Sequence, residues 1–230
     1  MVLEVRFTGQ VILEIPEKLR PVLFKGKDIT ERLWELAGAF DGCTLRVGRK
    51  RIKTEHGITE ALELKVLNKE LLQKPMVRRI FEVQDDFGII DVIENVEFYL
   101  KDEYRGQGIG KSALLIEAIA ANDLGFDRIW AIAAGGSVSG SGDIGYKVWP
   151  KLGYDAPIPG DILARMPQSE LIQAGLDLTK PVLLSMLLDS GLYGLWEQYG
   201  EGCHVEFDVS SLDSWSMKRL LSLFEGNSTP

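Results

Sequence analysis

A glycine-rich loop followed by a long apolar helix is the sequence feature that most constrains the fold. The loop lies in YRGQGIGKSALL (104–115), with glycines at positions 106, 108 and 110. In KSALLIEAIAANDLGF (111–126), apolar residues recur every three to four positions, which predicts a helix capped by Gly125. Glycines at such a helix start allow backbone N–H groups to approach a phosphate. The flanking residues must then indicate which phosphate the loop would bind.

The composition restricts the partners that the chain can bind. Hydrophobic residues make up 45% and charged residues 26% of the 230, and this length suits one large domain or one domain with an appendage. The formal net charge of −8 disfavours a nucleic-acid backbone as partner. No apolar run approaches membrane-spanning length. We therefore expect a cytoplasmic protein that binds neither nucleic acid nor a membrane.

The few cysteines and histidines exclude several kinds of active site. Cys43 and Cys203 lack CxxC spacing, so we expect free thiols in a reducing compartment. His56 and His204 are the only histidines, which excludes a multi-histidine metal site, and we expect no metal. His204 lies in the strand-like CHVEFDV, where a packed or edge histidine is more common than a catalytic base.

The alternation of apolar and polar residues predicts several strands around the long helix. The strand candidates are residues 3–15, 43–52, 60–68, 77–84, 89–100, 128–134 and 204–209. Residues 62–74 also have a helical interpretation. Further helices are expected at 27–40, where Asp28 and Glu31 are spaced as a capping box, in pieces between 157 and 200, and at 210–226. These elements predict an α+β (α/β) fold with a helical insertion before its last strand.

Two kinds of nucleotide-binding loop fit the glycines poorly. A Walker A loop needs a glycine five residues before Gly110, where Arg105 stands. A Rossmann turn needs an acidic residue at the end of the next strand, but that strand ends in Ala134-Gly135-Gly136. The polar KDEY (101–104) also separates the preceding strand from the glycines, which a Rossmann turn does not have.

The order of strand, polar link, glycine loop and helix resembles motif A of the GNAT superfamily of acyl-CoA N-acyltransferases. The matching residues are Arg105-x-x-Gly108-x-Gly110 after the strand VIENVEFYL, and WPKLGY (149–154) resembles the aromatic-rich segment that follows the family's next strand. The resemblance covers residues 1–156 and 203–210. It implies a GNAT-like mixed, mostly antiparallel central sheet flanked by helices. The implied parts are an acyl-CoA-binding core at 1–156, a helical insertion at 157–202, and a last core strand with a C-terminal helix at 203–230.

The resemblance also implies that acetyl-CoA or another acyl-CoA binds as a co-substrate. Loop N–H groups and the positive end of the helix dipole would hold the pyrophosphate. Phe98 and Leu100 match the family positions whose backbone groups pair with the amides of the pantetheine arm. The implied binding residues are Phe98, Leu100, Arg105, Gly106, Gln107, Gly108, Gly110 and Lys111.

An amine must lose a proton before it attacks a thioester, so the site needs a general base. Glu94 is the one charge on an otherwise apolar face of the strand before the loop, where burial would raise its pKa. Glu97 lies on the opposite face, and a bulge in this strand would exchange the two faces. Pairing of Glu94 with a basic neighbour is the structural alternative.

The group that would protonate the leaving thiolate departs from the family pattern. Trp149 stands where the family often has a tyrosine, and SGSGDIG (139–145) stands where it often has an asparagine. Tyr146, one turn before Trp149, is the candidate acid, and water is the other.

Two functional hypotheses follow from these matches and departures. In the first, the protein is an N-acyltransferase that moves an acetyl or other acyl group to an amine of a small molecule or a protein. In the second, it is a degenerate GNAT-fold protein, a non-catalytic acyl-CoA-binding or protein-interaction module. A weaker alternative makes the insertion, with Tyr193, Trp196 and Tyr199, an interaction surface. The C-terminal helix is a candidate contact for a homodimer.

Overall fold

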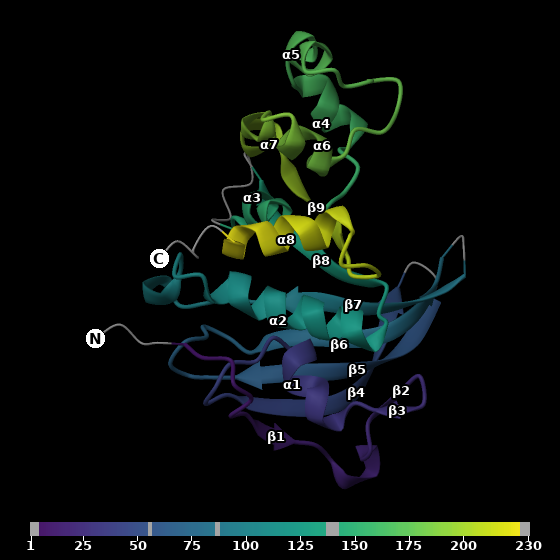
Figure 1. Cartoon of the computed structure of the whole chain (residues 1–230), viewed down its shortest axis with the longest axis vertical. Coiled ribbons are helices and arrows are strands. Elements are labelled where there is room, and N and C mark those ends of the chain that lie inside the picture. Colours follow the sequence, from purple (N-terminus) through teal and green to yellow (C-terminus); the bar gives the residue numbers. More distant parts are fainter. Residues whose placement is uncertain (1–4, 55–56, 86–87, 137–142, 226–230) are drawn as a thin grey trace. The chain divides into compact units, whose positions relative to one another are not determined.

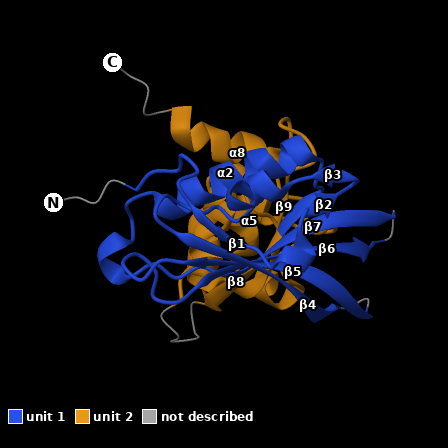
Figure 2. Cartoon of the chain, turned by 90° about the horizontal axis from the view of Figure 1, so that it is seen from below, with its two compact units in different colours: residues 1–129 blue, residues 130–230 orange. Residues whose placement is uncertain are grey.

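The computed structural model describes residues 5–54, 57–85, 88–136 and 143–225. The chain divides into two compact units, Met1–Ile129 and Trp130–Pro230, which Figure 2 distinguishes by colour. The expected core of residues 1–156 crosses this division, and its bounds stay a prediction. Among the sequence features, His56 and most of the glycine-rich segment before Tyr146 lie outside the described residues.

A mostly antiparallel sheet forms the body of unit 1 (Figure 1). Its strands follow one another in the order β1, β4, β5, β6, β7, in which β1 is parallel to β4 and the other pairs are antiparallel. The strands of this unit are β1 (Ile12–Glu14), β2 (Leu23–Phe24), β3 (Lys27–Asp28), β4 (Thr44–Thr54), β5 (Gly57–Leu67), β6 (Met76–Gln84) and β7 (Ile89–Glu97). The short β2 and β3 form a separate ribbon. The predicted α+β class with a mixed, mostly antiparallel sheet is confirmed.

One long helix covers one face of this sheet (Figure 1). The helices of unit 1 are η1 (Glu17–Leu19), η2 (Thr30–Arg32), α1 (Leu33–Leu36), η3 (Asp102–Tyr104) and α2 (Ile109–Leu124). Gly125 ends α2 in the left-handed conformation, with φ of 80°, as its sequence position predicts. A Cβ on Gly38, which follows α1, would lie 2.8 Å from the carbonyl oxygen of Ala113 in α2. Glycine therefore allows the two helical segments to approach closely.

The N-terminal part of unit 1 contains less regular structure than its sequence predicts. Within the described part of the expected strand at 3–15, only β1 forms, because the chain turns at Gly9 with φ of 85°, the position where a turn is also predicted. Asp41 accepts hydrogen bonds from the backbone N–H groups of Thr8 and Gln10 at this turn. The expected helix at 27–40 is reduced to η2 and α1. Asp28 forms no capping box, since its carboxylate accepts instead from the N–H and hydroxyl of Thr30.

Unit 2 contains short helices and two neighbouring strands. Its elements are β8 (Arg128–Gly136), which starts at the end of unit 1, α3 (Gly145–Val148), η4 (Pro150–Leu152), α4 (Gly160–Arg165), α5 (Gln168–Gln173), α6 (Leu184–Asp189), α7 (Tyr193–Tyr199), β9 (Glu201–Asp208) and α8 (Trp215–Glu225). The helices α4 to α7 lie between β8 and β9 in the chain, and the bounds of the expected insertion at 157–202 stay a prediction. Its aromatic residues Tyr193 and Trp196 are buried, which favours a core role over an interaction surface.

Candidate functional site

The glycine loop connects η3 to the first turn of α2. Gly108 is the N-cap residue, and no side chain caps the helix there. Within the described residues, the backbone N–H groups of Gly108, Ile109 and Gly110 have no hydrogen-bond acceptor. These are orphan donors of a helix start, and they lie at the positive end of the dipole of a 16-residue helix. The loop therefore offers several N–H donors to an anion.

The three glycines of the loop differ in why they must be glycine. Gly106 and Gly108 have φ of 74° and 81°, and a Cβ on either would meet no atom within 4 Å. Glycine is therefore favoured at these two positions by the left-handed backbone, and the space beside them is open. Gly110 is helical, and a Cβ there would lie 3.2 Å from the Cε1 atom of Phe98. A side chain at position 110 would thus crowd the Phe98 ring, a contact that the sequence did not reveal.

The polar side chains of the loop contact the segment that precedes it. Arg105 Nε donates to the carbonyl of Leu100 at 3.2 Å, and its Nη1 lies 3.0 Å from an exposed carboxylate oxygen of Asp102. The Gln107 amide donates to the carbonyl of Glu103 at 2.6 Å. Arg105 is half exposed, and Lys111 follows in the first turn of α2 with partial exposure. The structure thus brings the predicted loop residues together in one segment of unit 1.

A β-bulge ends β7 and determines which way the following residues face. Arg78 of β6 lies opposite Asn95, but Val77 lies opposite Glu97, so Val96 is an extra residue in β7. The predicted strand to Leu100 therefore ends at Glu97, and Leu100 forms only an isolated bridge with Leu72. The bulge was named from the sequence as an alternative, and the structure confirms it.

The bulge turns Phe98 towards the helix. The ring of Phe98 lies against Gly110 in the first turn of α2, and the guanidinium carbon of Arg78 lies 5.7 Å from its centroid. Leu100 belongs to the link towards η3, where its carbonyl accepts from Arg105. Both residues predicted to contact the pantetheine arm thus lie next to the loop, and their contact with a ligand stays a prediction.

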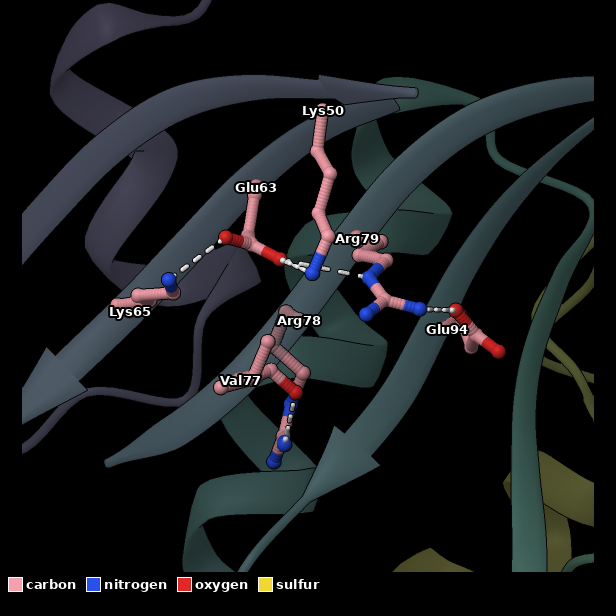
Figure 3. A network of polar contacts seen from close by, with 7 residues as sticks. All are labelled: Lys50, Glu63, Lys65, Val77, Arg78, Arg79 and Glu94. Carbon is pink, nitrogen blue, oxygen red and sulfur yellow. Dashed lines mark hydrogen bonds and ion pairs between the residues drawn. The ribbon is translucent and has the colours of Figure 1, made fainter. Parts of the chain in front are cut away.

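The environment expected for Glu94 is not the one that the structure has. Its carboxylate lies 3.1 Å from Arg79 Nη1 and is partly exposed, instead of being buried alone on an apolar face (Figure 3). Arg79 also lies 3.5 Å from Glu63, which Lys50 and Lys65 approach at 3.3 and 2.9 Å. We call these five residues, Lys50, Glu63, Lys65, Arg79 and Glu94, the charged-face network. Glu94 therefore pairs with a basic neighbour, and its role as the base stays a prediction.

Glu97 lies on the same face as Glu94 because of the bulge. It is opposite Val77, which shares its face of β6 with Arg79, and it pairs with Lys74 at 3.2 Å. Two carboxylates of β7 therefore lie on the face away from α2.

Tyr146 belongs to the buried core of unit 2. Its side chain is 3% exposed, and its hydroxyl donates to the carbonyl of Glu197 at 3.4 Å. The Trp196 indole N–H donates to the carbonyl of Tyr146 at 2.7 Å. Trp149 packs edge-on against the buried Tyr154, with ring centroids 5.1 Å apart. A role of Tyr146 as acid stays a prediction.

Sequence analysis missed a cluster of three buried polar residues beneath α2. Arg78 and Glu117 are 1% and 0% exposed, and Arg78 Nε lies 3.3 Å from Glu117 Oε1. The Asn95 amide donates to the other oxygen of Glu117 at 3.2 Å. Burial raises the pKa of Glu117 to about 7, against the lowering effect of Arg78 and Asn95. We call Arg78, Asn95 and Glu117 the buried cluster.

A signal for the buried cluster was present in the sequence. Glu117 is the one charged residue among the apolar positions of α2 that include Leu114, Ala118 and Ala121. Arg78 similarly interrupts an apolar alternation in β6 between Met76 and Ile80. A lone charge of each sign at positions expected to be buried would have suggested a pair.

Other potential sites are limited. Cys43 and Cys203 are free, as expected, and burial raises the pKa of each thiol to about 11. Among the described residues, no group of three or more histidine, cysteine, aspartate or glutamate side chains is placed to bind a metal ion. The described helices are also too short or too polar for any of them to span a membrane.

Comparison with solved structures gives distant likenesses. No protein-family model and no curated protein matches the chain. The crystal structure of nourseothricin acetyltransferase is similar at 15% sequence identity and a TM-score of 0.23. The similarity covers 47% of this chain and 68% of that one. We base no argument about function on a likeness of this size.

Proposed function

We propose that this protein is an acyl-CoA-dependent N-acyltransferase that moves an acetyl or other acyl group to an amine. The glycine loop is the observation that carries the proposal. It combines N–H donors at the start of α2 that find no acceptor among the described residues, open space beside Gly106 and Gly108, and the basic residues Arg105 and Lys111. A pyrophosphate is the anion that such an extended cradle suits.

The proposed reaction assigns a part to the loop, to the candidate base and to the candidate acid. Loop N–H groups bind the pyrophosphate, and the backbone near Phe98 pairs with the pantetheine arm in the manner of an added strand. A carboxylate takes the proton of the amine, whose nitrogen then forms a bond to the acyl carbon as the carbon–sulfur bond breaks. Coenzyme A leaves as a thiolate and takes a proton from Tyr146 or water.

Between the two candidate bases, the charged-face network favours Glu97 over Glu94. Arg79 holds Glu94 at 3.1 Å, in a network whose other members are already paired. Within the part of the chain that the structure describes, the Glu97 carboxylate pairs with Lys74 alone, at 3.2 Å and near the surface, and a surface pair of this kind is weak. We therefore expect Glu97→Gln to lower the rate of acyl transfer more than Glu94→Gln does.

Calorimetric titration with acetyl-CoA tests the cradle directly. Saturable binding of acetyl-CoA, and weaker or no binding of ATP and NAD, is the expected result. Gly108→Glu should abolish binding because it places a carboxylate where the pyrophosphate would lie. Dephospho-coenzyme A should bind nearly as well as coenzyme A, because it lacks the 3′-phosphate but keeps both the pyrophosphate and the pantetheine arm.

A matched control separates the loop from the general cost of replacing a left-handed glycine. Gly26, in the turn between β2 and β3, has φ of 76° and open space within 4 Å, as Gly108 does. Gly26→Glu should therefore carry the same backbone strain and leave acetyl-CoA affinity unchanged. Equal loss of binding in both variants, or no binding by the natural chain, would refute the proposed cradle.

A non-catalytic acyl-CoA-binding protein is the second candidate. It is favoured by the ion pair at Glu94, the burial of the Tyr146 hydroxyl against a carbonyl, and the tryptophan at position 149. A screen of polyamines, lysine peptides and aminoglycosides for release of free coenzyme A thiol distinguishes the two. Binding without thiol release for any amine would select this second function.

A further inference from the structure

Arg78 occupies a position in β6 where an apolar side chain would be expected. Its guanidinium donates through Nη1 to the carbonyls of Val77 and Glu97, at 3.2 and 3.3 Å. Its neighbour Arg79 projects instead into the charged-face network, as Figure 3 shows. Two adjacent arginines of one strand thus serve opposite faces of the sheet.

Stability alone does not explain a buried arginine at this position. A buried ion pair is commonly no more stabilising than apolar residues of similar volume, because both charges lose their hydration. Arg78 Nε and Glu117 Oε1 face each other across 3.3 Å, yet neither forms a hydrogen bond within the described residues. The pair is therefore imperfectly satisfied, and its geometry points to another role.

The contacts of Arg78 connect three parts of the proposed cradle. Its bond to the Glu97 carbonyl lies at the bulge, where β7 ends. Its guanidinium carbon lies 5.7 Å from the centroid of the Phe98 ring, which in turn lies against Gly110 at the start of α2. Its counter-ion Glu117 is on α2 itself. The Arg78 side chain thus contacts both the end of β7 and the helix that begins at the loop.

We propose that Arg78, with Glu117 as its counter-ion, is a positioning residue for the acyl-CoA cradle. It holds the Glu97 carbonyl and the Phe98 ring so that the end of β7 and the loop keep the spacing that the pantetheine arm and the pyrophosphate require. This inference rests on the proposed function. Arginine suits the task better than lysine, because its planar fork makes several directed contacts at once.

The test replaces both charges together, so that no buried charge is left without a partner. The double variant Arg78→Met/Glu117→Leu should fold, because apolar side chains of similar volume fill the same space. Among residues 97–110, we expect the backbone amides that have an acceptor, such as those of Lys101, Tyr104 and Arg105, to exchange with deuterium at least tenfold faster, with β4 and β5 unchanged. The dissociation constant for acetyl-CoA should rise at least tenfold.

Two further variants keep the test decisive. Arg79→Met removes the neighbouring arginine from the same strand and should change neither the exchange of residues 97–110 nor the affinity. Arg78→Lys retains the charge without the fork, so it should give an intermediate rise in exchange and in the dissociation constant. If the double variant does not fold, Arg78→Lys alone decides between the two outcomes.

The outcomes separate this proposal from the proposed function. A folded variant with unchanged exchange at 97–110, faster exchange throughout unit 1, or unchanged affinity would overturn the positioning role. If the natural chain binds no acetyl-CoA, the proposed function fails. The exchange measurement on the free protein then still decides whether Arg78 positions this segment.

Discussion

The two faces of the sheet in unit 1 bear similar charged groups in different surroundings. Beneath α2, the buried cluster places Arg78 and Glu117 at 1% and 0% exposure. On the other face, Lys50 and Lys65 of the charged-face network are nearly half exposed, and each lies near the mostly buried Glu63 (Figure 3). The same pairing of opposite charges therefore occurs with and without access to water.

The contribution of an ion pair to stability therefore depends more on its access to water than on the distance between the charges. The pair in the buried cluster is 3.3 Å long, and the Lys50–Glu63 pair has the same length. Loss of one partner leaves a charge in the dry interior in the first case, whereas water replaces the partner in the second. Variants of matched residues on the two faces test whether this difference is real and how large it is.

Removal of one arginine from each face should give the largest difference. Arg78→Met leaves Glu117 buried without a counter-ion and should lower the free energy of unfolding by about 3–5 kcal/mol at pH 8. Arg79→Met should cost at most about 1 kcal/mol, because its partners keep other contacts and water. Urea unfolding of both variants measures the two losses. Equal losses would contradict the contrast.

The two faces should also respond to pH with opposite signs. The pKa of Glu117 is raised from 4.5 to about 7, so the folded state binds more protons between these values. Ionisation of Glu117 should then reduce stability as pH rises through this window, by about 3 kcal/mol at most. Comparison of the natural chain with Glu117→Gln between pH 4.5 and 8 isolates this effect.

Glu63 provides the opposite case on the charged face. Its burial raises the pKa, but hydrogen bonds from Lys65 and Lys50 outweigh this effect and lower it overall. Its contribution to stability is therefore present above the unfolded value and lost as pH falls through the folded one. The Glu63→Gln variant should have a lower free energy of unfolding than the natural chain at neutral pH, and this difference should become smaller at acidic pH. A difference in the free energy of unfolding that did not change with pH would show that the folded state does not stabilise the anionic form of Glu63.

The faces should differ in how they accept an added methyl group. Gly48, in the same row as Glu63 and Arg79, has no atom within 4 Å of a built Cβ, so Gly48→Ala should stabilise by about 0.5–1 kcal/mol. Gly110→Ala should give none of the gain expected in a helix, because its Cβ would lie 3.2 Å from the Phe98 ring. Thermal unfolding of both variants measures the difference. A clear gain from Gly110→Ala would mean that the ring moves freely.

Salt should produce the smallest difference between the faces. Lys65→Met should cost less than about 1 kcal/mol, and the cost should vanish near about 0.5 M NaCl because exposed charges are screened. The cost of Arg78→Met should be unchanged by salt. Denaturant unfolding at low and high salt checks both, and a salt-dependent cost at Arg78 would indicate that water reaches the buried cluster.

Local pattern was sufficient for most strands, for α2 and for the loop. The alternation in β4 to β7 and the apolar period of α2 are local properties, and the glycines at 106 and 108 match a backbone that requires positive φ. The buried cluster was missed because Arg78 and Glu117 meet only through tertiary packing. The prediction of an apolar environment for Glu94 was wrong for a related reason: its partner Arg79 is on another strand.

The extra residue Val96 decides which face of the sheet each residue after it points towards. Before it, even-numbered residues such as Glu94 belong to the charged face, whereas after it the odd-numbered Glu97 does. A regular ladder that kept Val96 opposite Val77 would instead turn Glu97 towards α2 and Phe98 towards the charged face. The bulge alone therefore decides that the aromatic ring, and not the acid, faces α2 at the end of β7.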